Sequence, residues 1–155
     1  KLLRPEWKQV AGDRWIVLST LKEAATVAKN LAKEQRLSCV FLTTGYQGLE
    51  HFKCIERPHF LVRLVDQKSR LAAVPNFTVV NARGPFSVTQ ELSLYKKYKV
   101  QALVSKNSGA KAVYAKIIAA RLLQLPVIMV DRPKMPEGNL CKTVDAAIAW
   151  LGETS

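Results

Sequence analysis

Short runs of apolar residues alternate along this chain with segments whose apolar residues recur at helical spacing. The run Pro126-Val127-Ile128-Met129-Val130 has no polar member. A strand that is apolar at every position is buried on both faces, which is typical of parallel sheets covered by helices on both sides. The pattern predicts an α/β fold, a Rossmann-like three-layer domain with a mostly parallel sheet of about four to five strands. The candidate strands are residues 13–18, 39–43, 60–65, 77–80, 100–104 and 126–130.

Helix start signals lie between these runs. Thr20-x-x-Glu23 and Ser87-x-x-Gln90 have the spacing of capping boxes, and each precedes a helical pattern. We expect these two helices to end near Arg36 and Tyr98. Further helices are expected over residues 111–123, as a short turn through about residue 54, and from Thr143 through residue 151.

The length and composition predict one domain over residues 1–155, because nearly half of the residues are apolar. No apolar run approaches the roughly 20 residues needed to cross a bilayer, and no signal peptide is recognisable, so we expect a soluble, cytoplasmic protein. Cys39, Cys54 and Cys141 form no Cys-x-x-Cys pair, and the spacing of His51 and His59 fits no metal motif. We therefore expect no metal site.

The formal net charge of +12 indicates either an anionic partner or cations that complement helix dipoles. Lys29, Lys33 and Arg36 would close one helix, and such residues account for much of the charge. A basic nucleic-acid-binding module remains an alternative.

The loops after parallel strands converge at one sheet edge, where anionic ligands bind. Two of them pair a cation with a glycine, Arg83-Gly84-Pro85 and Lys106-Asn107-Ser108-Gly109. A lysine at a helix N-terminus opposes the dipole, so Lys106 suggests a bound anion. The candidate cofactor-binding or substrate-binding residues are Thr44, Gly45, Arg83, Gly84, Pro85, Lys106, Asn107, Ser108, Gly109, Lys111 and Arg132.

Several of these residues also have a purely structural interpretation. Gly45 and Gly48 can serve a tight turn between strand and helix, and Arg132 can be a solvated loop cation. Ser87 can be explained by a role as helix cap alone, and Phe86 by packing alone. The chain has no His-Glu-x-x-His motif and no Ser-His-Asp order, so a hydrolase is not expected and no catalytic residue is named. A bound cofactor would then carry the chemistry.

Seven segments, spread over nearly the whole chain, are distinctive in their order and spacing. They are Arg4-Pro5-x-Trp7, Gly12-Asp13-Arg14-Trp15, Phe41-Leu42-Thr43-Thr44-Gly45, Arg83-Gly84-Pro85-Phe86-Ser87, Lys106-Asn107-Ser108-Gly109, Arg121 and Asp131-Arg132-Pro133. Together they resemble the C-terminal half of the precorrin-6A reductases. Ala110 departs from the resemblance, since the family usually has a second glycine there.

The resemblance implies a reductase of cobalamin biosynthesis that transfers hydride from NADPH, or from NADH, to a double bond of an anionic corrin precursor, precorrin-6A or cobalt-precorrin-6A. It also implies a cleft between two Rossmann-like halves. The chain begins at Lys1 and lacks the family's N-terminal half, so we expect it to be inactive alone. A non-catalytic tetrapyrrole-binding domain is the second alternative.

Overall fold

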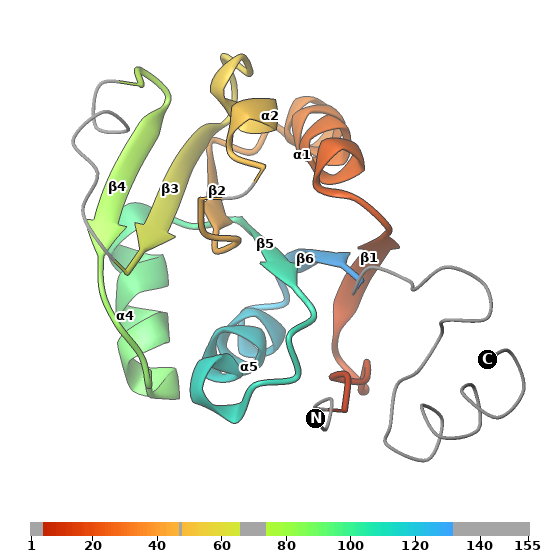
Figure 1. Cartoon of the computed structure of the whole chain (residues 1–155), viewed down its shortest axis with the longest axis vertical. Helices are drawn as coiled ribbons and strands as arrows, with labels where there is room; N and C mark the ends of the chain where they lie inside the picture. The colour runs from red at the N-terminus through yellow and green to blue at the C-terminus, as the bar shows by residue number, and fades with distance from the viewer. Residues whose placement is uncertain (1–4, 47, 66–73, 132–155) are drawn as a thin grey trace, which may run out of the picture.

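The computed structural model describes residues 5–46, 48–65 and 74–131 as an α/β domain (Figure 1). Its sheet has six strands in the order β1-β6-β5-β2-β3-β4, and all five pairings between neighbours are parallel. The strands are β1 (Arg14–Leu18), β2 (Cys39–Leu42), β3 (His59–Leu64), β4 (Phe77–Asn81), β5 (Ala102–Lys106) and β6 (Pro126–Val130). The α/β class and the parallel sheet are confirmed, whereas the expected count of about four to five strands is too low. All six candidate runs became strands, because each is long enough to pair with a neighbour.

Helices cover both faces of this sheet. In Figure 1, α1 and α2 lie on one side, and α4 and α5 lie on the other. The helical elements are α1 (Leu21–Gln35), α2 (Glu50–Lys53), α4 (Val88–Tyr98), the 3₁₀ turn η1 (Lys111–Val113) and α5 (Ala115–Leu122). The expected helix over residues 111–123 is therefore a 3₁₀ turn followed by a shorter α-helix. The helix expected from Thr143 lies outside the described residues.

The core is split in two by the sheet. Val40 and Leu42 point into the cluster on the α1 side, and Phe41 between them points into the cluster that holds Tyr95 of α4 and Ile117 of α5. All three β2 residues are at most 1% exposed. Side chains of a strand alternate between faces, so a strand apolar at every position fills both cores at once.

The predicted capping signals begin both long helices. The Ser87 hydroxyl accepts from the Gln90 N–H at 3.1 Å, and the Gln90 side chain accepts from the Ser87 N–H at 2.8 Å. At α1, the Thr20 hydroxyl accepts from the Glu23 N–H at 3.1 Å. None of the helices within the described ranges is both long and apolar enough to cross a membrane.

Replacing Ser87 with alanine tests the cap. Ser87→Ala removes the acceptor for one N–H and should lower the free energy of unfolding by about 1 kcal/mol in urea titrations. Ser93→Ala is the matched control, since Ser93 is exposed within the same helix and alanine favours helix there. Equal losses from the two variants would contradict a role for Ser87 as the cap.

Candidate functional site

The residues that follow the strands are aligned at the carboxyl edge of the sheet. The N–H of Thr43, just after β2, donates to the Val104 carbonyl of β5 at 3.1 Å. The N–H of Ala82, after β4, donates to the Leu64 carbonyl of β3 at 3.0 Å. The parallel pairing thus carries segments distant in sequence to one edge, where ligands of α/β proteins bind.

A cavity of about 310 Å³ opens at this edge. It lies where β2, β3, β4 and α5 meet, and it contains two of the predicted site residues, Gly45 and Gly84. Its lining comprises Thr43, Gly45, Tyr46, Arg63, Leu64, Val65, Ala82, Gly84, Phe86, Val113 and Lys116.

The two glycines of the first turn have different roles. Gly45 has φ +75°, and an added Cβ would meet nothing within 4 Å, so it leaves backbone open to the cavity. At Gly48 a Cβ would lie 2.3 Å from Cδ1 of Leu21 on α1. Gly48 therefore serves packing of the turn against α1, and Gly45 is the one that borders the candidate site.

Arg63, which lines the cavity, belongs to a buried ion pair. Arg63 of β3 donates from Nη1 and Nη2 to the two carboxylate oxygens of Glu91 on α4, at 2.6 and 2.8 Å. Arg63 is 9% exposed and Glu91 is 1% exposed. The guanidinium also lies 3.9 Å from the ring centroid of Phe86 and 4.8 Å from that of Phe41. Both hydrogen bonds and both rings hold Arg63 in one position, and Arg63 in turn supports the loop that carries Phe86.

Lys116 of α5 also faces the cavity although it is only 5% exposed. Its ammonium donates to Thr43 Oγ1 at 3.1 Å and lies 5.8 Å from the ring centroid of Trp7. Burial lowers the pKa of Lys116 to about 7, the positive charge of Arg63 acts in the same direction, and Glu91 opposes both. Lys116 is therefore a lysine that changes charge near neutral pH.

The structure corrects the prediction for Lys106. Lys106 is the last residue of β5, and α5 begins only at Ala115, so this lysine is not at a helix N-terminus and the dipole argument is wrong. Asn107 is buried and binds the backbone of Trp7 instead. Its Oδ1 accepts from the Trp7 N–H at 2.8 Å, and its Nδ2 donates to the Trp7 carbonyl at 2.9 Å. Ser108 Oγ accepts from the N–H of Ala110 at 3.2 Å. Asn107 and Ser108 therefore both make hydrogen bonds that stabilise the backbone of this part of the structure.

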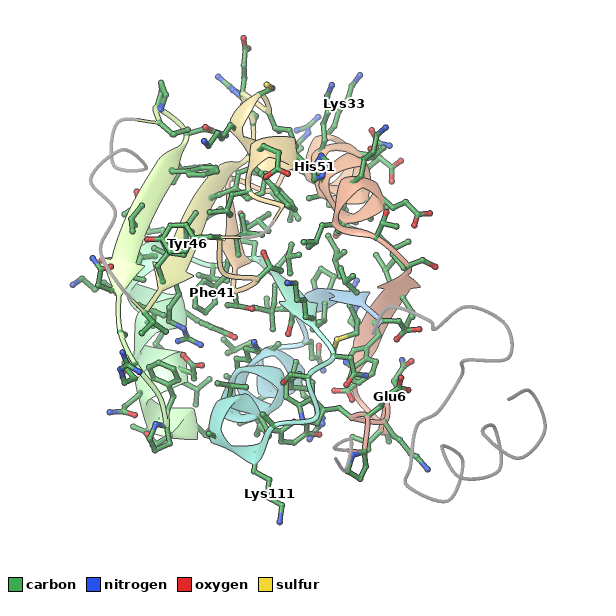
Figure 2. All side chains as sticks on the ribbon, viewed as in Figure 1. Glu6, Lys33, Phe41, Tyr46, His51 and Lys111 are labelled. Carbon is green, nitrogen blue, oxygen red and sulfur yellow. The ribbon has the colours of Figure 1, made fainter. Side chains whose placement is uncertain are left out.

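The remaining predicted residues surround the cavity or lie elsewhere. Arg83, Pro85 and Lys111 are exposed, and Figure 2 shows Lys111 projecting away from the body of the domain. Thr44 is 6% exposed, and within the described ranges its Oγ1 has no hydrogen-bond partner. Arg132 lies outside the described residues. Gly109 has φ +70° and, with Lys106, Asn107 and Ser108, is absent from the cavity lining.

Sequence reasoning missed the two charged residues of the cavity. Arg63 interrupts the apolar run Phe60–Leu64 and Lys116 sits in a helix rich in Ala and Ile. A cation inside a pattern that otherwise predicts burial is rare, and this signal marks both. Among the residues that the structure describes, no three His, Cys, Asp or Glu side chains are grouped to hold a metal ion.

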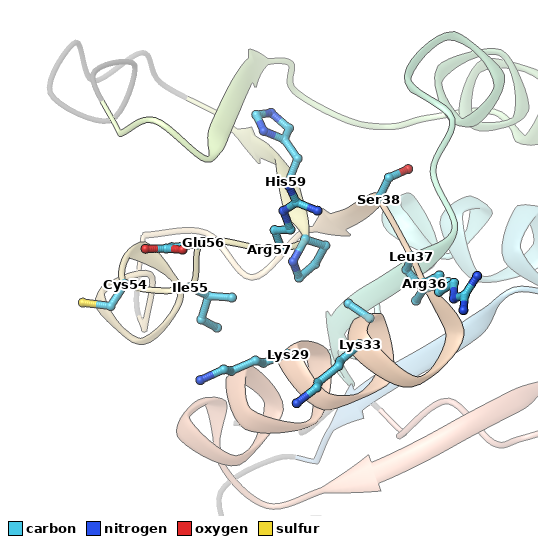
Figure 3. A pocket seen from close by; sticks show the side chains of 12 residues that line it. Lys29, Lys33, Arg36, Leu37, Ser38, Cys54, Ile55, Glu56, Arg57 and His59 are labelled. Atoms are coloured by element: carbon cyan, nitrogen blue, oxygen red, sulfur yellow. The ribbon is translucent and has the colours of Figure 1, made fainter.

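A larger, basic cavity of about 1040 Å³ lies at the opposite, amino edge of the sheet (Figure 3). Its lining includes Ser38 and His59, at the starts of β2 and β3, and four cations. These are Lys29, Lys33, Arg36 and Arg57. Lys33 is in the last turn of α1 and Arg36 is its C-cap, where cations complement the helix dipole. We assign the candidate site to the carboxyl edge, because ligands of parallel sheets bind there.

Replacing Lys116 with methionine tests whether burial in the folded chain lowers the pKa of this lysine. An unfolded lysine titrates near 10.5, so between pH 7 and that value the unfolded chain binds a proton that the folded chain has lost. Stability of the unsubstituted chain should therefore rise with pH relative to Lys116→Met, by about 1 kcal/mol per pH unit in urea titrations from pH 7 to 10. Parallel pH profiles of the two proteins would contradict a lowered pKa.

Replacing Asn107 tests whether it serves structure. Asn107→Ala leaves the Trp7 N–H and carbonyl without their partners and should speed hydrogen exchange of the Trp7 amide at least ten-fold. Ser108→Ala, one residue further on, is the control and should leave that amide protected. An unchanged Trp7 exchange rate in Asn107→Ala would return Asn107 to the ligand-binding candidates.

Comparison with known proteins agrees with the fold described above. The chain is 39% identical over 150 residues to a precorrin-6A reductase of Rhodobacter capsulatus and 38% identical over 154 residues to one of Rhodococcus erythropolis, each match covering 97% of this chain. It spans 58% and 59% of the lengths of those two relatives. A solved structure of CobK precorrin-6A reductase superposes with a TM-score of 0.78 at 37% identity, covering 98% of this chain and 59% of that one.

A model of the family described as precorrin-6x reductase CbiJ/CobK matches residues 1–152. The match extends over all of the described strands and helices, including the loops at the carboxyl edge. This chain therefore belongs to the precorrin-6x reductase CbiJ/CobK family.

Proposed function

We propose that this chain forms part of a reductase that transfers hydride from a reduced nicotinamide nucleotide to a carbon–carbon double bond of a corrin precursor, precorrin-6A or cobalt-precorrin-6A, in cobalamin biosynthesis. The family match over residues 1–152 is the observation that carries the proposal. NADPH is our first choice of reductant, and NADH is the alternative.

The carboxyl-edge cavity supports this proposal. Open backbone at Gly45 and the buried cations Arg63 and Lys116 suit a ligand that carries phosphates or carboxylates. The nucleotide, when bound, supplies the hydride. The chain's own residues bind and orient: Arg83 and Lys106, which lie outside the cavity lining, are proposed to attract anionic groups of the ligand.

We further propose that residues 1–155 make a single Rossmann-like domain that forms one wall of a ligand cleft. The curated relatives are longer than the region that this chain matches. In the proposal, the unmatched part of such a protein supplies the other wall, and contacts from both walls hold nucleotide and macrocycle together.

A second candidate function is nucleic-acid binding. The basic cavity at the amino edge and the net charge of +12 are the observations that favour it. Against it, His59 carries the only aromatic ring among the described residues that line that cavity, and no Phe, Tyr or Trp there offers a larger surface for bases to stack on. A tetrapyrrole-binding domain without reductase activity differs from the main proposal only in failing to oxidise NADPH.

Titration of the chain with NADP⁺ and with nonspecific duplex DNA separates these functions. We expect NADP⁺ binding that weakens about ten-fold in Arg83→Ala and in Lys106→Ala, because each loses a charge-assisted contact. Lys33→Ala removes the same charge at the amino edge and should leave NADP⁺ affinity unchanged. Turnover is measured as NADPH oxidation with precorrin-6A in a chimera that carries this chain in place of the matching region of the Rhodobacter capsulatus relative.

The opposite pattern would contradict the reductase proposal. Tight DNA binding that is lost steeply between low and moderate salt, and weakened by Lys33→Ala, would favour the nucleic-acid function. Absence of NADP⁺ binding and of turnover in the chimera would reject nucleotide-dependent reduction.

A further inference from the structure

Lys116 has fewer partners than a buried ammonium requires. The group has three N–H donors, and within the described residues Thr43 Oγ1 is its single hydrogen-bond acceptor. Thr43 in turn donates its own hydrogen to the Val104 carbonyl at 2.8 Å, so its oxygen can only accept from the lysine. Thr43 therefore holds the amine in place on a residue that lines the cavity, and within the described residues the other N–H groups of Lys116 have no hydrogen-bond acceptor.

Within the described residues, no carboxylate forms an ion pair with Lys116. Glu91 is the acid whose charge opposes the lowering of the Lys116 pKa, and both of its oxygens are already bound by Arg63. Tyr95 of α4 donates its hydroxyl to the backbone carbonyl of Lys116 at 2.9 Å and offers nothing to the ammonium. When Lys116 is protonated, the cluster of Arg63, Glu91 and Lys116 carries one positive charge in excess. An uncompensated charge is costly in a buried position.

The size of the cavity limits what could compensate this charge. A volume of about 310 Å³ corresponds to roughly ten water molecules at about 30 Å³ each. A whole corrin macrocycle does not fit in that space, whereas one carboxylate side chain or one phosphate group does. Val65, Phe86 and Val113 give the cavity apolar walls. Lys116 is therefore the lining residue that we expect to bind a carboxylate or phosphate.

We propose that the cavity at the carboxyl edge is an oxyanion subsite in which the Lys116 ammonium, positioned by Thr43, binds one carboxylate or phosphate group of a larger ligand. The subsite rests on the proposed function only for the identity of that ligand. A carboxylate would come from the tetrapyrrole and a phosphate from the nucleotide.

Binding at this subsite is coupled to a proton. Burial and Arg63 disfavour the charged form of Lys116 in the empty cavity, and an anion beside the amine favours it. The bound group therefore draws a proton onto Lys116 above pH 7, and affinity for the anion falls as the pH rises further.

The test follows the pKa of Lys116 by NMR of the intact chain labelled with ¹³C-lysine. The chain is titrated with pH in sodium chloride, in sodium propionate and in inorganic phosphate at equal ionic strength. Lys116→Met assigns the resonance by its loss, and Lys116→Arg does so if the methionine variant fails to fold. Lys96→Met removes an exposed lysine of α4 and should leave the resonance in place.

In chloride, Lys116 should titrate near 7, well apart from lysines near the ordinary 10.4. One of the two anions should raise its pKa by about 1 to 3. A rise in propionate alone assigns the subsite to a carboxylate, and a rise in phosphate alone assigns it to a phosphate. Thr43→Val should reduce the rise, and Thr43→Ser should restore it.

An unchanged Lys116 pKa in both anions would overturn the subsite, and so would a pKa near 10 in chloride. Because the probes are small ions, either result is independent of whether the chain binds NADP⁺. Conversely, loss of NADP⁺ binding with an intact response to propionate would reject the nucleotide part of the proposed function and leave the subsite standing.

Discussion

Parallel pairing of six strands is the constraint on which the candidate site depends. Every strand ends at the same edge, so residues that follow β2, β3 and β4 border one cavity although some 40 residues of sequence separate Thr43 from Ala82. The helices must cover both faces of such a sheet, because its strands are apolar on both sides. In the described part of the chain, the loops that follow the strands lie at the carboxyl edge, where the candidate site is.

The buried Arg63–Glu91 pair links this edge to the core beneath it. A charge on β3 is tolerated because a carboxylate on α4 meets it with two hydrogen bonds and two aromatic rings flank it. The pair has two effects at the cavity. It anchors Phe86 and the loop around Gly84, and it leaves Lys116 beside a cation whose own acid is already engaged. Burial is the main cause of the lowered Lys116 pKa, and Arg63 adds to it, so the pair contributes to both the geometry of the loop and the charge state of the lysine.

Local signals predicted the elements well and the roles of several loops poorly. The capping boxes at Thr20 and Ser87 are confirmed because their partners lie three residues away. Lys106 was expected at a helix start, but the chain stays non-helical through Gly109 and Ala110, where Asn107 instead binds the backbone of Trp7, 100 residues distant. No pattern within one segment reveals a partner that far away.

The sequence by itself determined the α/β class, the order of strands and helices along the chain, the caps, and the family resemblance, since each depends on residue types at short, regular spacing. It also indicated Gly45 and Gly84 as site residues, and both line the cavity. Only the tertiary structure decided that Arg63 pairs with Glu91, that Thr43 holds Lys116, and that Asn107 supports Trp7 while Arg83 lies on the surface. The physical reason is that burial and the dielectric around a charge depend on which strands become neighbours, and in this sheet β2 lies between β5 and β3 rather than beside the strand that precedes it.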